Sequence, residues 1–238
     1  MSWHQGPMVA FDTETTGTDP TQARIVTACV VRLGAGRDPV VRNWLANPGV
    51  PIPPEATEVH GVTDEQARAE GADPAEVAAE VAGELVAAWH EGLPVVAMNA
   101  SYDLTVLDGE LRRHGLGGLD EQRGDTPLLI VDPLVIDRVL DRYRRGKKRL
   151  VELCEVYNVS LTDAHTAEAD AVAAARVAWR QAERYPDELQ CDLLELQAKQ
   201  AAWHVEWADH FEPWLRANAD PDATIDRAWP LRAPAQAH

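Results

Sequence analysis

Short runs of hydrophobic residues in the first half of the chain predict strands. Residues 8–14, 24–33 and 40–45 are rich in apolar or β-branched side chains, and turn residues separate them. Their short connections favour an antiparallel meander. Residues 94–98 and 128–131 are apolar throughout, as buried parallel strands are. We therefore expect five strands in one mixed sheet.

Hydrophobic residues at helical spacing lie between and after these strands. Val77, Val81 and Leu85 follow Asp73-Pro74, a capping residue and a proline that are typical of a helix start. Further helices are predicted from Asn99 to Gly115, from Asp132 to about residue 143, over 150–157 and from Ala167 to about Arg184, and residues 117–124 are expected to form a loop. Three strands followed by alternating helices and strands indicate an α/β fold with helices on both faces of the sheet.

The turn residues 185–187 divide the chain into a domain over 1–185 and a helical C-terminal extension over 186–238. The helix of the extension is predicted from Glu188 to Glu212, where Pro213 is expected to interrupt it. Its apolar seam has nearly heptad spacing and consists of Leu189, Leu193, Leu196, Gln200, Trp203, Trp207 and Phe211. This seam fits a long helix that lies on its own domain. The alternative is a helix that pairs with a second copy or with a partner protein.

The composition limits the classes of function. The chain has 238 residues, 45% of them hydrophobic, which is enough for one sizeable core. Its net charge of −17 repels a polyanion at long range, so contacts with nucleic acid are expected to be local and assisted by metal ions or a basic patch. Three cysteines without a C-x-x-C pair argue against a disulfide framework or a zinc cluster. We expect a cytoplasmic protein, with no signal peptide, membrane span or membrane partner.

Two acids one residue apart end the first predicted strand. Side chains alternate between the faces of a strand, so Asp12 and Glu14 point to one face and Phe11 and Thr13 to the other. Two carboxylates about 4 Å apart repel each other by about 4 kcal/mol at an effective dielectric constant of about 20. A divalent metal ion between them relieves this repulsion. The pair therefore predicts a metal site.

Further candidate residues follow later elements. Asp103 lies at the start of the helix after the fourth strand, Asp170 lies in the first turns of the last helix of the domain, and His165 precedes that helix. Strand C-termini and helix N-termini gather at one edge of an open α/β sheet, where ligands bind. The alternatives are a helix-start role for Asp103 and a loop position without a role for His165.

Three motifs resemble, in order, those of the DEDDh or DnaQ-like 3′–5′ exonucleases. They are F-D-T-E-T-T-G at 11–17, N-A-S-Y-D at 99–103 and H-T-A-E-A-D-A at 165–171. In addition, H-G-V-T at 60–63 resembles a family segment that contacts the 3′-terminal nucleotide. The family includes the epsilon proofreading subunit of bacterial DNA polymerase III. The resemblance implies an RNase H-like fold, in which a mixed five-stranded sheet is flanked by helices.

The resemblance also implies roles for single residues. Asp12, Glu14 and Asp170 would bind one Mg²⁺ or Mn²⁺ ion, Asp12 would bridge to a second ion supported by Asp103, and His165 would act as the general base. Two divalent cations balance the charge of four carboxylates. Substrate contacts are expected from Thr13, Thr15, Thr16, Gly17, His60, Asn99 and Tyr102. For Asn99 and Tyr102 the alternative is that they only pack against the strand end or hydrogen-bond to it. For His60 the alternative is a surface position before a helix, and for Thr15 and Thr16 it is a role as turn residues.

A basic run between residues 142 and 149 holds six of the 22 lysines and arginines. One interpretation is a solvated helix end, which the helix dipole favours. The other is a loop that contacts phosphates, because its local charge can offset the net charge of the chain within a Debye length of about 8 Å. The candidate phosphate contacts are Arg144, Arg145, Lys147 and Lys148.

Three functions fit these features. The preferred one is a metal-dependent 3′–5′ exonuclease that releases nucleoside 5′-monophosphates from single-stranded or frayed 3′ ends, with DNA as the first candidate substrate. The second is a proofreading subunit whose residues 186–238 bind a polymerase or a second copy. The third is an RNA-trimming exoribonuclease of the oligoribonuclease or RNase T type. Aromatic residues make up only 6% of the chain, and the sequence points to no base-stacking platform.

Overall fold

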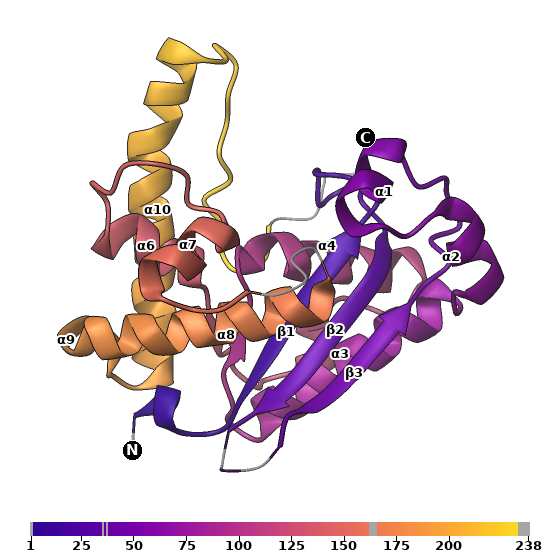
Figure 1. Ribbon diagram of the computed structural model, residues 1–238, viewed down its shortest axis with the longest axis horizontal. Coiled ribbons are helices and arrows are strands. Elements are labelled where there is room, and N and C mark those ends of the chain that lie inside the picture. Colours follow the sequence, from indigo (N-terminus) through magenta and orange to yellow (C-terminus); the bar gives the residue numbers. More distant parts are fainter. Residues whose placement is uncertain (1, 35, 37, 162–165, 233–238) are drawn as a thin grey trace.

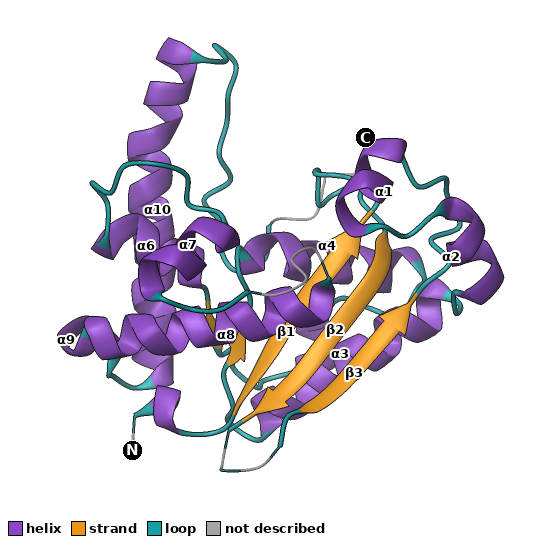
Figure 2. Ribbon diagram, in the orientation of Figure 1, coloured by secondary structure: helices purple, strands orange, loops and turns teal. Residues whose placement is uncertain are grey.

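Five strands form one mixed sheet at the centre of the molecule. The computed structural model describes residues 2–34, 36, 38–161 and 166–232. The strands are β1 (Met8–Thr15), β2 (Ile25–Leu33), β3 (Val40–Leu45), β4 (Val95–Val96) and β5 (Ile130–Val131). Their order is β3-β2-β1-β4-β5, in which β1 to β3 are antiparallel and β4 and β5 run parallel to β1 (Figure 2). The predicted mixed five-stranded sheet is confirmed.

The helices lie mostly where their spacing predicts them. They are α1 (Pro54–His60), α2 (Asp64–Glu70), α3 (Pro74–His90), α4 (Ala100–Arg113), α5 (Leu119–Arg123), α6 (Pro133–Leu140), α7 (Leu150–Tyr157), α8 (Ala167–Arg184), α9 (Pro186–Leu189) and α10 (Leu193–Asn218). Helix α6 ends earlier than predicted, because Lys148 Nζ donates to the carbonyl oxygens of Asp137 and Asp141 at 3.0 and 2.9 Å. Helix α5 replaces an expected loop, since Asp108 of α4 accepts the Leu119 amide at 2.8 Å.

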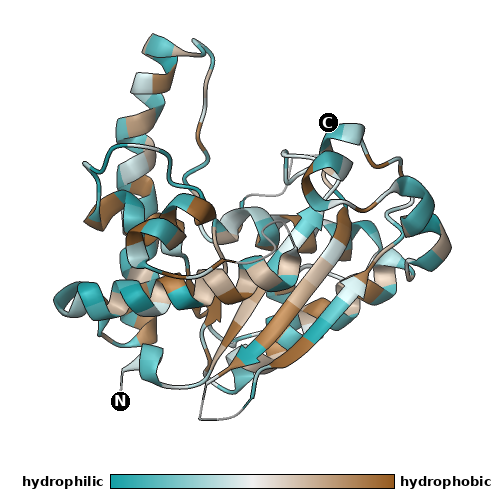
Figure 3. Ribbon diagram, viewed as in Figure 1, coloured by the Kyte–Doolittle hydropathy of each residue, from teal (hydrophilic) through white to brown (hydrophobic). Residues whose placement is uncertain are grey.

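Strand β1 contributes to both layers of the core. Val9 and Phe11 are buried with side chains of α3 and α4, whereas Met8 and Ala10 are buried with side chains of α8. In Figure 1, α8 crosses in front of the strands and α3 runs behind them. Hydrophobic colour follows most of β1 and β2 in Figure 3, as expected for strands covered on both faces. Even-numbered residues of β1 therefore face α8, and odd-numbered residues face α3 and α4.

Helix α10 of the extension is hydrogen-bonded to the edge strand β5. Gln197 Oε1 accepts the Ile130 amide at 2.9 Å, and Gln200 Nε2 donates to the Ile130 carbonyl oxygen at 2.8 Å. Gln200 Oε1 also accepts the amide of Asp132 at 2.7 Å. Gln200 is fully buried. Gln200, which the heptad pattern placed in the seam, therefore attaches α10 to the rest of the same chain through polar contacts.

The predicted interruption at Pro213 is wrong, because α10 continues through it to Asn218. A proline removes one backbone hydrogen bond, and contacts on both sides can hold such a helix together. Here Glu212 pairs with Arg216 across the proline at 3.0 Å and accepts the Ile225 amide at 2.8 Å. The helix also begins later than predicted, at Leu193, after the short α9.

The segment after α10 returns along that helix to α4. His204 Nε2 donates to the Asp226 carbonyl oxygen at 2.9 Å, and Arg227 pairs with Glu212. The Arg232 amide then donates to Thr105 Oγ1 of α4 at 3.1 Å. The segment after α10 is thus tied to the body of the chain. No helix in the described parts of the chain has the length and apolar character needed to cross a membrane.

Candidate active site

Three carboxylates meet where β1 ends beside the start of α8. Asp12 and Glu14 are even-numbered residues of β1 and face α8, as their alternation predicts. Asp170 lies in the first turn of α8. One oxygen from each of the three side chains lies within 4.8 Å of the other two. The structure therefore brings together the three acids that the sequence assigns to one metal ion.

The end of β1 is irregular next to these acids. The partner of Glu14 on β2 is Thr27, whereas the partner of Thr15 is Ile25, so one residue of β2 is skipped in the pairing. Such an irregularity bends a strand and changes the direction of its side chains. It lies between Glu14 of the acidic cluster and the turn at Thr16 and Gly17.

Asp103 approaches the cluster from α4, on the other side of β1. Thr13 is an odd-numbered residue of β1 and faces this helix. Its amide and its hydroxyl both donate to Asp103 Oδ1, at 3.0 and 2.7 Å. Asp103 is 4% exposed. Thr13, predicted as a substrate contact, thus holds a carboxylate of the site in one orientation.

The four acids are short of positive charge. Burial, together with the negative charges of Asp103, Glu14 and Asp170, raises the pKa of Asp12 well above its usual range. Burial and the charges of Asp170 and Asp103 raise the pKa of Glu14 to about 7. Burial raises the pKa of Asp103 to about 7, although the hydrogen bonds from Thr13 oppose this shift. Clustered carboxylate oxygens suit hard divalent ions such as Mg²⁺ and Mn²⁺.

A second buried acid positions the start of α4. Asp132, 1% exposed, accepts the amides of Asn99 and Ala100 at 3.0 Å each. It also accepts the Leu134 amide at the start of α6 at 2.9 Å. Asn99 has a left-handed backbone, with φ of 64°. The sequence indicated Asp132 only as a helix start, and no local signal linked it to Asn99, 33 residues away.

The loop after β1 is held by Tyr102. The Tyr102 hydroxyl donates to the Gly17 carbonyl oxygen and is hydrogen-bonded to Thr15 Oγ1. Thr15 Oγ1 also lies 2.9 Å from that carbonyl oxygen, so the two hydroxyl protons are shared among three contacts. Thr16 Oγ1 accepts the Arg24 amide at 3.0 Å. The residues predicted as substrate contacts around Gly17 thus form one connected loop beside the carboxylates.

A cavity of about 860 Å³ opens next to Glu14. Its lining includes Glu14 and His60 together with Trp44, Leu45, Val62 and Arg176. His60 Nδ1 accepts the Val62 amide at 3.2 Å, and its Nε2 is buried. Burial lowers the pKa of His60, so its ring is neutral near pH 7. The mixed lining, with apolar side chains such as Trp44, Leu45 and Val62 beside the polar His60, suits a ring-bearing ligand.

The predicted basic run is divided between two environments. Arg144 and Lys148 both pair with Oδ2 of the fully buried Asp137, at 2.6 Å each. Arg145 and Lys147 are exposed and form no ion pair with the described residues. Asp137, which sequence reasoning missed, explains why two of the six basic residues in this run point inward. His165, the predicted general base, lies outside the described residues.

Comparison with known proteins matches most of the chain to one family. The RNase_T model, described as an exonuclease, covers residues 9–178. A DNA polymerase III subunit epsilon-like protein of Rhodobacter capsulatus is 36% identical over 172 residues, which are 70% of this chain and 22% of that protein. A PolC-type DNA polymerase III of Lacticaseibacillus paracasei is 27% identical over 165 residues, which are 69% of this chain and 10% of that protein. The chain thus spans a small part of these relatives.

Solved structures share the fold. Escherichia coli exonuclease I in complex with a dT13 oligonucleotide has a TM-score of 0.62 and 20% identity, and the match covers 77% of this chain and 42% of that one. The exonuclease I of Methylocaldum szegediense has a TM-score of 0.62 and 24% identity, over 76% of this chain and 41% of that one. These matches confirm the predicted RNase H-like fold. Since the family model matches more than half of the sequence, the chain belongs to the RNase_T exonuclease family, as its three motifs predicted.

Proposed function

We propose that this chain is a metal-dependent 3′–5′ exonuclease that hydrolyses the terminal phosphodiester bond of a single-stranded or frayed DNA 3′ end. The products are nucleoside 5′-monophosphates. One observation carries the proposal. In a chain of this family, Asp12, Glu14 and Asp170 present oxygens within 4.8 Å of one another, beside a cavity of about 860 Å³.

In this proposal the four acids hold two Mg²⁺ or Mn²⁺ ions. Asp12, Glu14 and Asp170 would hold one ion, and Asp12 and Asp103 would hold the other. When bound, such ions activate a water molecule and stabilise the leaving 3′-oxygen. Thr13 keeps the Asp103 carboxylate in place through its two hydrogen bonds.

The remaining roles fall to groups around the cluster. His165 accepts the proton of the attacking water, as a base with a pKa near neutrality can. His60 and Tyr102 position the terminal nucleotide from the cavity and from the Gly17 loop. Arg145 and Lys147 contribute contacts to more distant phosphates.

The relatives support DNA rather than RNA as the substrate of this chain. The named relatives are DNA polymerase III proteins, and the related exonuclease I structures were solved with the deoxyoligonucleotides dT13 and dA16. The test is a nuclease assay with Mg²⁺ or Mn²⁺ on end-labelled single-stranded DNA, duplex DNA and short RNA. We expect stepwise shortening of single-stranded DNA from its 3′ end, fastest among the three substrates.

Matched variants make this assay specific for the site. Asp12→Ala and Asp103→Ala are expected to abolish turnover while the circular dichroism spectrum stays unchanged. Glu65→Gln, which removes an exposed charge in the first turn of α2, serves as the control and is expected to keep full activity. Full activity of either Ala variant would rule out the proposed site.

A proofreading subunit is the second candidate, because the epsilon-like relative is 36% identical over most of this chain. In that case residues 186–238 bind a polymerase. Co-purification of the chain with a polymerase catalytic subunit would favour this candidate. If the native protein from the same extract migrates without a polymerase, a stand-alone exonuclease is favoured.

A further inference from the structure

Stacked aromatic rings cover one side of the C-terminal half of α10. Trp207 and Phe211 have ring centroids 5.4 Å apart and an interplanar angle of 26°. Phe211 and Trp214 are also 5.4 Å apart, with an interplanar angle of 10°. The spacing of four and three residues places the three rings on one side of the helix. Trp214 is 54% exposed, so the row of rings reaches solvent.

Cations surround these rings. Arg138 of α6 lies over the Trp207 ring, with its Cζ atom 3.6 Å from the ring centroid, and it forms no direct ion pair with a described carboxylate. The rings, Arg138, Arg142 and Lys148 line a cavity of about 560 Å³, and Glu206 is the only acid in that lining. Lys148 is paired with the buried Asp137 and Arg142 with Glu206, so Arg138 is the lining arginine that has no direct ion pair with a described carboxylate.

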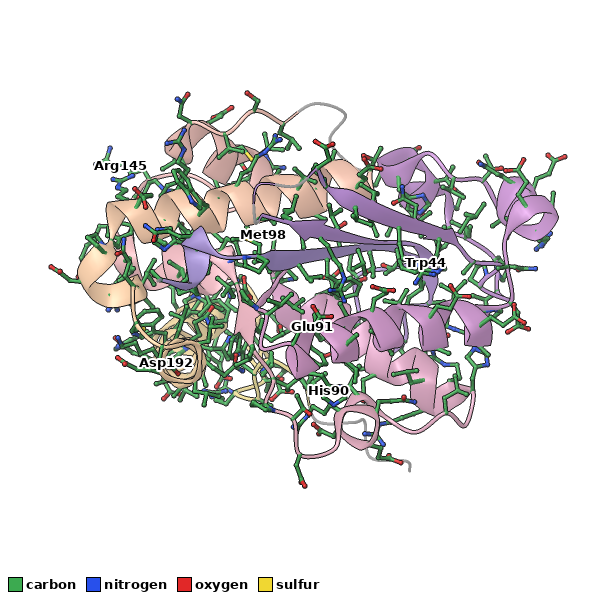
Figure 4. All side chains as sticks on the ribbon, turned by 90° about the horizontal axis from the view of Figure 1, so that it is seen from below. Trp44, His90, Glu91, Met98, Arg145 and Asp192 are labelled. Atoms are coloured by element: carbon green, nitrogen blue, oxygen red, sulfur yellow. The ribbon has the colours of Figure 1, made fainter. Side chains whose placement is uncertain are left out.

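The connection between α6 and α7 adds a further ring and further charges. Tyr143 is 91% exposed. Arg145 and Lys147 are exposed as well, and Figure 4 shows Arg145 at the periphery of the molecule. Tyr143 lies next to Arg142, whose Cζ atom is 5.9 Å from the Tyr143 ring centroid. We call the surface formed by Arg138, Arg142, Tyr143, Trp207, Phe211 and Trp214 the α10 platform.

We infer that the α10 platform binds single-stranded nucleic acid, with bases stacked on its rings and phosphates on its arginines. Stacking on aromatic side chains within a basic groove is the usual way in which proteins hold single strands without sequence preference. The arginine over Trp207 adds a cation–π contact of the kind found in such sites. Charge complementarity favours a phosphate backbone over an apolar helix as the occupant, since an apolar helix would cover the Arg138 guanidinium without giving it a partner.

The platform is separate from the carboxylate cluster. In Figure 1, the C-terminal half of α10 projects on the same side of the molecule as the C-terminal end of β1, where Asp12 and Glu14 lie. A strand whose 3′ end lies at the carboxylates can therefore continue toward α10. This part of the inference rests on the proposed function, whereas binding of a strand to the platform does not.

The test measures binding without catalysis. Fluorescence anisotropy of a 5′-labelled oligothymidylate of about 20 nucleotides is recorded in EDTA, so that no cleavage occurs. Tyr143→Ser and Trp214→Ala are each expected to weaken binding by about 5-fold or more, because each removes a stacking surface. Tyr143 is so exposed that its replacement leaves folding intact. Trp179→Ala is the matched control, since this partly exposed tryptophan of α8 lies outside the platform.

A second measurement separates this inference from the proposed function. A dinucleotide is too short to reach both sites, so its kcat/KM is expected to be the same in Tyr143→Ser and in the wild type, whereas the KM for the long strand increases. If the chain cleaves neither substrate, the proposed function fails and the binding result still stands. Wild-type affinity of both variants for the long strand would overturn the inference. Binding of an acidic, aromatic peptide to the platform in place of the oligonucleotide would overturn it too.

Discussion

Thr13 donates two hydrogen bonds to a single oxygen of Asp103, at 3.0 Å from its amide and 2.7 Å from its hydroxyl. Thr13→Val keeps the shape of the side chain and removes the second bond. We expect kcat/KM on single-stranded DNA to fall about 10-fold, since a hydrogen bond to a charged group contributes about 1.5–3 kcal/mol. The pH–rate profile is expected to shift to higher pH, because that bond lowers the pKa of Asp103.

Thr13→Ser provides the control for this substitution. It restores the hydroxyl, so activity and the pH profile are expected to return close to those of the wild type. If Thr13→Val were as active as the wild type over the whole pH range, the hydroxyl would have no part in holding Asp103.

The metal-free protein is expected to lose stability as the pH rises. Glu14 and Asp103 have pKa values of about 7 in the folded chain, above the value of about 4 in the unfolded chain. The folded state therefore binds more protons between about pH 4 and about pH 7, and the free energy of unfolding falls across this range and levels off above it. Melting temperatures measured in EDTA at a series of pH values check this.

Addition of Mn²⁺ is expected to reverse this trend. The ion binds the deprotonated carboxylates, so its affinity increases over the same pH range, and an ion at 100 times its Kd stabilises the fold by about 2.7 kcal/mol. Asp12→Asn is expected to raise the melting temperature in EDTA, because it removes one of the repelling charges, and to weaken the response to Mn²⁺. A melting temperature in EDTA that does not change with pH would contradict the charge cluster.

The basic residues of the α6–α7 connection are expected to act in two different ways. Arg145→Ala and Lys147→Ala remove exposed charges, so we expect weaker binding of single-stranded DNA and a smaller salt dependence, with no change in stability. Lys148→Met removes a partner of the buried Asp137. It is expected to lower the free energy of unfolding by about 1–3 kcal/mol in urea titrations. The interpretation fails if the two kinds of variant cannot be distinguished by these measurements.

Gln200→Leu is expected to destabilise the fold by about 2–3 kcal/mol. It leaves the Ile130 carbonyl oxygen and the Asp132 amide without their partners, and both groups are buried. Activity is expected to fall as well, because Asp132 holds the start of α4, which carries Asp103. Gln190→Leu, which removes a side-chain contact to the Ala182 carbonyl oxygen outside this network, is the control in the same urea titration. Equal stability of the two variants would argue against a special role for Gln200.

The parts of the site that depend on local pattern could be predicted from the sequence. Alternation along one strand placed Asp12 and Glu14 on the same face, and the position of Asp103 and Asp170 at helix starts placed them at the same edge. The contact from Thr13 to Asp103 joins residues 90 positions apart, and no spacing rule indicates it.

The remaining differences between the predictions and the structure also come from contacts between residues that are far apart in the sequence. Gln200 was a polar residue in an apolar seam, and only its hydrogen bonds to Ile130 and Asp132 explain that position. The aromatic content of 6% gave no indication of a stacking surface. Three rings of α10 lie beside Arg138 of another helix only in the folded chain. The amino-acid composition therefore cannot indicate this surface.

The glutamines of α10 have a consequence for handling the protein. Unpaired edge strands act as templates on which a second chain can add a strand and aggregate. Gln197 and Gln200 occupy the amide and carbonyl groups of Ile130 on β5. At the opposite edge, Val40 and Val41 of β3 are exposed but are followed by the charged Arg42. A truncated chain that ends before α10 would thus present a bare apolar edge and would be prone to self-association.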